Sequence, residues 1–126
     1  MELLLQGFIS VIQPQIFLIL VAGTLGGIII GALPGLTATM GVALLTPLTF
    51  SMPPATGLVM LCGIYCGAIY GGSISAILIR TPGTPAAAAT VFDGNELAKK
   101  GLAGKALGMS AIASCIGGIF SALCLT

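Results

Sequence analysis

Hydroxyl side chains beside two Pro-Gly pairs are the groups in this sequence best suited to binding a ligand. Thr37 and Thr39 follow the first pair, and Thr81 and Thr84 flank the second. A helix that begins after such a break presents N–H groups without intrahelical partners, and these groups attract anions together with nearby hydroxyls. The residues predicted to bind a substrate are Pro34, Gly35, Thr37, Thr39, Ser73, Ser75, Thr81 and Thr84.

The first pair, Pro34-Gly35, separates a segment just long enough to cross a membrane from one that is too short. This pattern is typical of discontinuous helices, which place a helix N-terminus near the membrane midplane of transporters. The same residues are equally compatible with a turn at the membrane surface, where Thr37 or Thr39 only caps the next helix. The sequence leaves both interpretations open.

The second pair, Pro82-Gly83, follows the only cation near these features, Arg80. We expect Thr84 to be the N-cap of a following helix, with Pro85 at its first position. Arg80 is expected either to extend to the membrane interface or to clamp a carboxylate. A helix N-terminus therefore follows a Pro-Gly turn here as well.

Ser73 and Ser75 lie in the apolar run before the second pair, where a hydroxyl either bonds to its own helix or faces a ligand. A single helix end contributes only about 0.3–1 kcal/mol when exposed and about 2 kcal/mol when partly buried. One break therefore cannot hold a di- or tricarboxylate against its hydration. We expect both breaks and several hydroxyls to contribute to one composite site.

Other kinds of chemistry are poorly supported. The chain has no histidine, and its three acidic residues, Glu2, Asp93 and Glu96, lie outside the apolar runs. His-based catalysis, a metal centre and an intramembrane carboxylate pair are therefore excluded, and we expect no enzyme. The net charge of +1 provides no field for nucleic acid. The cysteines are expected to be small buried residues rather than metal ligands: Cys62, Cys66, Cys115 and Cys124.

The composition excludes a soluble domain. Of the 126 residues, 57% are hydrophobic and 6% are charged, whereas soluble domains carry roughly 25% charge. No charged residue lies between Glu2 and Arg80, so lipid must be the solvent. No basic segment precedes the first apolar stretch, and a cleavable signal peptide is not expected. The expected fold is an all-α integral membrane protein whose helices are interrupted at the Pro-Gly breaks.

Four apolar runs define the expected helices. Because about 20 residues cross a bilayer, Ala55–Ile79 is long enough to span and Ile16–Leu33 is just long enough. Leu36–Phe50 is too short to cross alone. Ala106–Thr126 stops while still apolar. We therefore expect residues 1–126 to be the N-terminal part of a larger permease, and to form part of the first half of a transporter bundle.

Residues 80–105 form the polar connection and contain all four basic residues of the chain. The positive-inside rule places this loop in the cytoplasm. Asp93 as N-cap, with Glu96 as its capping partner, predicts a short helix from Gly94 to Lys100 that Gly101 ends. The side of the membrane on which the N-terminus lies depends on whether the short second run crosses or re-enters, and the sequence leaves that open.

Small residues recur at spacing four in two of the apolar runs, and such stripes let helix backbones approach closely in lipid. They predict helix association, and an alternative function would be a small structural or pore-forming membrane protein that oligomerises through them. The stripes are Gly23, Gly27 and Gly31, and then Gly63, Gly67, Gly71 and Ser75.

Three stretches closely resemble the large membrane subunit of the tripartite tricarboxylate transporters, the TctA family: Gly31–Gly41, Leu61–Leu78, and Pro82–Thr90 with the following Asp93-Gly94. The resemblance begins at about Gly23 and covers only the N-terminal part of that longer subunit. Arg80 departs from the family, which commonly has a neutral polar residue there. The substrate preference is therefore not carried over.

The resemblance implies a secondary-active importer of carboxylates such as citrate in the bacterial inner membrane. It implies a cation gradient as the driving force, with sodium as the candidate ion. It also implies two partners, a small membrane subunit and a periplasmic solute-binding protein that delivers the substrate. The residues predicted above would then be this chain's share of the transport pathway, opposite a second repeat.

Overall fold

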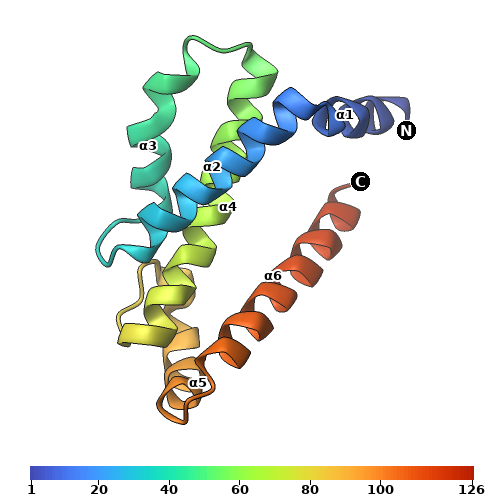
Figure 1. Cartoon of the computed structure of the whole chain (residues 1–126). Helices are drawn as coiled ribbons and strands as arrows, with labels where there is room; N and C mark the ends of the chain where they lie inside the picture. Colours follow the sequence, from blue (N-terminus) through green and yellow to red (C-terminus); the bar gives the residue numbers. More distant parts are fainter.

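The computed structural model describes all residues, from Met1 to Thr126, and contains helices without strands (Figure 1). The elements are α1 (Glu2–Ile12), α2 (Pro14–Ala32), α3 (Ala38–Thr49), α4 (Pro54–Ile79), the 3-10 turn η1 (Pro85–Ala87), α5 (Ala88–Lys99) and α6 (Ala103–Leu125). By length and composition, α2, α4 and α6 are each able to cross a membrane. The predicted all-α polytopic membrane protein is confirmed.

Prolines and glycines set the helix boundaries. Pro14 and Pro54 occupy the first helical positions of α2 and α4, where a missing N–H costs nothing. Gly35 has φ +99° in the turn that follows α2, a conformation that side chains with a Cβ rarely adopt. The four expected apolar helices therefore begin and end within three residues of the predicted positions.

Helices α2 and α4 pack backbone to backbone through their glycines. A Cβ on Gly23, Gly27 or Gly31 would come within 3.0 Å of a carbonyl oxygen of α4, and a Cβ on Gly67 or Gly71 would do the same against α2. Glycine is required at these positions because any side chain would force the two backbones apart. The predicted stripes therefore form a helix contact inside one chain.

The partners of these glycines show that α2 and α4 run parallel. The opposing pairs are Gly23 with Met60, Gly27 with Ile64, and Gly31 with Ala68, so both helices advance by four residues at each step. Between them, α3 runs in the opposite direction and carries the chain back to the end of the molecule where α2 began (Figure 1). Both predicted spans therefore point the same way.

Helix α5 is anchored to the last turn of α4. The buried side chain of Asn95 donates from Nδ2 to the carbonyl oxygen of Ile77 at 3.0 Å, which satisfies a carbonyl that has no intrahelical partner. Helix α6 then runs back along the molecule, and the hydroxyl of Tyr70 donates to the carbonyl of Leu107 at 3.4 Å. As a result, the N- and C-termini lie at the same end of the molecule (Figure 1).

Two sequence predictions are wrong, and one helix was not expected. Helix α5 begins at Ala88, so Asp93 lies inside it and caps nothing. The turn at η1 already starts the helix, and Gly101 with φ +79° ends it as expected. The four cysteines are exposed rather than buried: on α4 glycines occupy the positions in contact with α2, and on α6 only Ala106 is buried. Helix α1 lies before the first predicted run.

Candidate functional site

The second Pro-Gly break and the last turn of α2, which precedes the first break, approach the same turn of α4. After Ile79 the chain turns back, and the Gly83 N–H donates to the Gly72 carbonyl at 3.5 Å. A Cβ on Gly83 would lie 2.9 Å from the Gly72 Cα and against the carbonyl oxygen of Gly31, near the end of α2. We call this meeting point the break junction; it consists of Gly31, Gly72, Ser75, Gly83 and Thr84.

The α4 residues of the break junction, Gly72 and Ser75, lie within about two turns of the last residue of the helix, Ile79. Gly31 faces Ala68, and from Ala68 to Ile79 the helix rises about 16 Å further. Helix α2 therefore ends well before α4 does.

Thr84 has the most unusual environment in the break junction. Its side chain is only 5% exposed, and its buried Oγ1 has no hydrogen-bond partner. The residue packs on Gly72, where an added Cβ would lie 2.8 Å from Oγ1. Thr84 is the N-cap of η1 and Pro85 is its first residue, as expected, but the side chain makes no capping bond. A buried hydroxyl without a partner costs about 1–3 kcal/mol.

The two predicted serines face different surroundings. Ser75 is buried in the break junction, and its hydroxyl donates to the Gly72 carbonyl at 3.0 Å. Its hydroxyl therefore bonds within its own helix, which is one of the two fates expected of it. Ser73 lies half-buried on the other side of α4, in a groove beside α5 and α6. Ser75 and Thr84 therefore lie together in the break junction, whereas Ser73 lies apart from both.

The threonines of the first break form a pair of their own. The hydroxyls of Thr37 and Thr39 are 2.8 Å apart, and the Thr37 Oγ1 accepts from the Met40 N–H at 3.3 Å as the N-cap of α3. Thr37 is half-buried and Thr39 is exposed, and both lie at a helix start, where N–H groups remain free. Three other predicted site residues are exposed in the turns: Pro34, Gly35 and Thr81.

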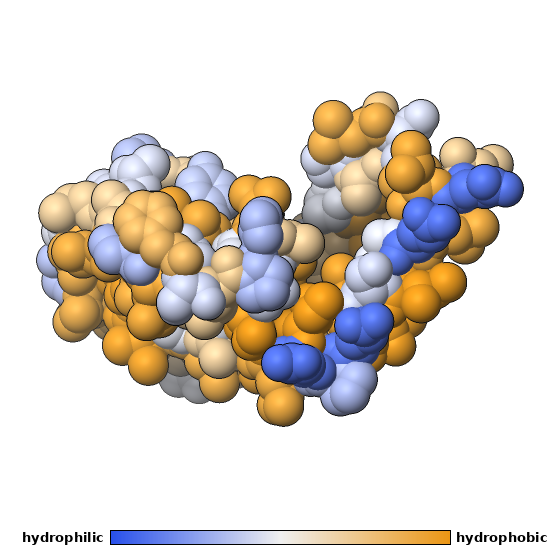
Figure 2. All heavy atoms as spheres, turned by 90° about the horizontal axis from the view of Figure 1, so that it is seen from above, coloured by the Kyte–Doolittle hydropathy of each residue, from blue (hydrophilic) through white to orange (hydrophobic).

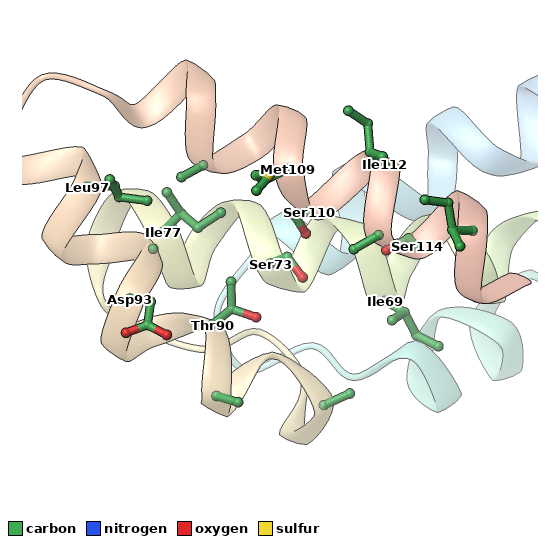
Figure 3. Close-up of a pocket in the computed structure, with 16 residues that line it drawn as sticks. Ile69, Ser73, Ile77, Thr90, Asp93, Leu97, Met109, Ser110, Ile112 and Ser114 are labelled. Atoms are coloured by element: carbon green, nitrogen blue, oxygen red, sulfur yellow. The ribbon is translucent and has the colours of Figure 1, made fainter.

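A groove of about 870 Å³ separates α6 from α4 and α5 (Figure 3). Its walls are mainly apolar. The groove reaches the second break at Ala86. Ser110 and Ser114 of α6 were not predicted as site residues, although their spacing of four places both on one face of an apolar helix. The polar residues that line it are Ser73, Thr90, Asp93, Ser110 and Ser114.

Comparison with known proteins identifies the family. Residues 17–126 match the tripartite tricarboxylate transporter TctA family. An uncharacterized 52.8 kDa protein from the TAR-I ttuC' 3' region of Agrobacterium vitis is 44% identical over 119 residues, which cover 94% of this chain and 24% of that relative. The chain therefore spans about a quarter of that relative's length.

No solved structure matches the chain. The family match nevertheless covers all of α3 to α6 and nearly all of α2, including both Pro-Gly breaks and every residue of the break junction. The family is one of transporter components. This chain belongs to the tripartite tricarboxylate transporter TctA family, as the resemblance of its three sequence stretches implied.

Proposed function

We propose that the break junction is this chain's contribution to a carboxylate-binding site in a cation-driven transporter of the bacterial inner membrane. The observation that carries the proposal is the buried, unpartnered hydroxyl of Thr84. A transporter must release its substrate, so a donor left unsatisfied in the empty site is the feature that a bound carboxylate oxygen would complete. The cost of the empty state is then recovered on binding.

The chemistry of the break junction suits an anion held by dipoles. It contains no charged side chain, and its polar groups are the hydroxyls of Ser75 and Thr84 and the N–H groups at the start of η1. Such groups attract a carboxylate more weakly than a full ion pair would. The bound substrate can therefore be released quickly. Thr37 and Thr39 are proposed to contribute from the first break, and Ser75 and Thr84 from the second.

The rest of the proposal follows from family membership. The substrate would be a tricarboxylate such as citrate, delivered by a periplasmic solute-binding protein, and a small membrane subunit would complete the complex. A cation, with sodium as the candidate, would supply the driving force. Because the chain spans about a quarter of its relative, other segments of the permease would form the opposing wall of the site.

The alternative function, oligomerisation through the glycine stripes, has lost its support. Both stripes face each other within one chain, and added side chains there would meet backbone carbonyl oxygens. No stripe on α2 or α4 is left for a second copy. A pore built from copies would have to use another surface, and no observation on this chain favours one.

The test is citrate uptake by cells that carry the complete permease with Thr84→Val. Valine keeps the shape of threonine and removes only the hydroxyl. Since a hydrogen bond to a charged group contributes about 1.5–3 kcal/mol, we expect the apparent affinity for citrate to fall roughly tenfold to a hundredfold. The matched control is Thr46→Val, whose hydroxyl bonds to the Val42 carbonyl of its own helix at 2.6 Å.

An unchanged affinity in the Thr84→Val permease, at normal membrane levels, would remove Thr84 from the site. If Thr84→Val and Thr46→Val reduced uptake equally, the effect would be one of helix packing. Binding of citrate to the isolated permease, measured calorimetrically, separates loss of binding from loss of transport.

A further inference from the structure

Helix α1 is amphipathic, although it was not anticipated from the apolar runs. Its polar side chains Glu2, Gln6 and Ser10 repeat at a spacing of four and form one stripe. Together with Gln13, the non-helical residue that follows the helix, we call them the α1 polar stripe. Leu4, Phe8 and Val11 lie on the opposite face. No residue of α1 is buried against the rest of the chain.

The orientation of α1 differs from that of the spanning helices. It projects sideways from the start of α2, across the direction in which α4 and α6 run (Figure 1). Figure 2, which views the molecule from above, shows hydrophilic side chains in a line over the side where α1 lies, beside a surface that is otherwise mostly apolar. A helix with one polar and one apolar face, lying across the spans, has the geometry of an interfacial helix.

The parallel packing of α2 and α4 determines the side of the membrane on which α1 lies. Helix α3 returns the chain to the level where α2 began, whether or not it crosses completely, so only α4 carries the chain to the opposite side. The connection after α4 holds all four basic residues of the chain, and the positive-inside rule makes that side cytoplasmic. The start of α2 is therefore extracytoplasmic.

We propose that α1 lies in the outer surface of the membrane, with the α1 polar stripe toward water and with Leu4, Phe8 and Val11 among the lipid acyl chains. The partner of this apolar face is lipid at the boundary between headgroups and acyl chains. The proposal does not depend on the proposed transport function.

The first test determines the side of the membrane. The four native cysteines are exposed and are replaced by alanine, and one new cysteine is introduced by Gln6→Cys or by Lys100→Cys. A membrane-impermeant maleimide is added to cells whose outer membrane alone has been permeabilised. We expect Gln6→Cys to be labelled at once and Lys100→Cys only after lysis. Labelling of Gln6→Cys only after lysis would overturn the proposal, as would labelling of both without lysis.

The second test determines the depth of α1. The chain has no tryptophan, so Phe8→Trp and Gln6→Trp each give a single fluorescent probe, on opposite faces of the helix. In vesicles of brominated phosphatidylcholine we expect at least a twofold stronger quenching of Phe8→Trp than of Gln6→Trp, and the reverse order with aqueous iodide. Equal quenching of the two probes by iodide would place the Phe8 face in water and overturn the proposal. A Phe8→Trp probe that neither quencher reaches would place this face against protein and overturn it as well.

Discussion

Glycines on two parts of this molecule have opposite surroundings. On α2 and α4, most glycines lie against backbone of the facing helix and leave no room for a Cβ. On α6, Gly104, Gly108, Gly117 and Gly118 have no atom within 4 Å of the position a Cβ would take. Glycine content alone therefore does not identify a packed helix. The difference comes from matched stripes on both partners, because two smooth faces are needed before backbones can approach.

This difference divides the chain into a tightly packed part, α2 and α4, and a loosely packed part, α6. Helices α2 and α4 share a long contact, whereas Ala106 is the only buried residue of α6. Helix α6 is held mainly at its start, through α5 and through the bond between Tyr70 and Leu107. Substitutions on the two parts should therefore differ in both the size and the sign of their effects on stability.

The largest effect is expected from Gly67→Val. A Cβ at this position would meet the carbonyl oxygen of Thr24, and separating the two backbones should cost about 3 kcal/mol or more. The free energy of unfolding is measured by titrating the detergent-solubilised chain with SDS and following near-UV circular dichroism. Gly108→Val on α6 is the control, and equal losses in the two variants would remove the distinction between the two parts.

A smaller effect is expected from Asn95→Ala, which tests the joint between the two parts. The substitution removes the buried hydrogen bond to the Ile77 carbonyl, and leaving that group unsatisfied should cost about 2 kcal/mol. The same SDS titration measures the loss. Glu96→Ala, at an exposed neighbouring position, should have little effect. A loss below about 0.5 kcal/mol for Asn95→Ala would show that α5 and α6 are attached in another way.

Thr37→Val should cost about 1 kcal/mol, because it removes the N-cap of α3. Thr39→Val is the matched variant. It also removes the hydrogen bond between the two hydroxyls, but it leaves the bond from the Met40 N–H to Thr37 intact. The difference between the two variants in the SDS titration isolates the cap. Equal losses would mean that the hydroxyl pair, and not the cap, stabilises the first break.

The smallest effect, with the opposite sign, is expected from Gly108→Ala. Nothing lies near the added methyl group, and alanine favours a helix over glycine by roughly 0.5–1 kcal/mol. We expect a small increase in stability in the same titration. A marked decrease would show that this face of α6 already packs closely against something, as the glycine faces of α2 and α4 do.

The sequence predicted the features that depend on local chemistry. The Pro-Gly pairs predicted where α2 and α4 end, and the spacing of Gly23, Gly27 and Gly31 predicted a close helix contact. Thr37 was correctly considered as a cap. These predictions succeeded because each rests on a property of a few neighbouring residues, such as the missing N–H of proline.

Features that depend on distant residues were not predictable from the pattern. The Asp93 and Glu96 capping signal was overridden because η1 already starts the helix, and because Asn95 is fixed against Ile77, eighteen residues away. The contacts of Thr84 with Gly72 and of Gly83 with Gly31 depend on how the chain turns back after α4. The roles of the predicted site residues in transport stay predictions.

The long charge-free segment has a consequence for biogenesis. The ribosome must synthesise α1 to α4 before Arg80, the first basic side chain, emerges, and basic residues are the main signal that orients a helix during insertion. Between Glu2 and Arg80 neither α2 nor α3 is flanked by a basic side chain. Within residues 1–126, the side chains that can orient this segment follow α4, the helix whose glycines pack against α2.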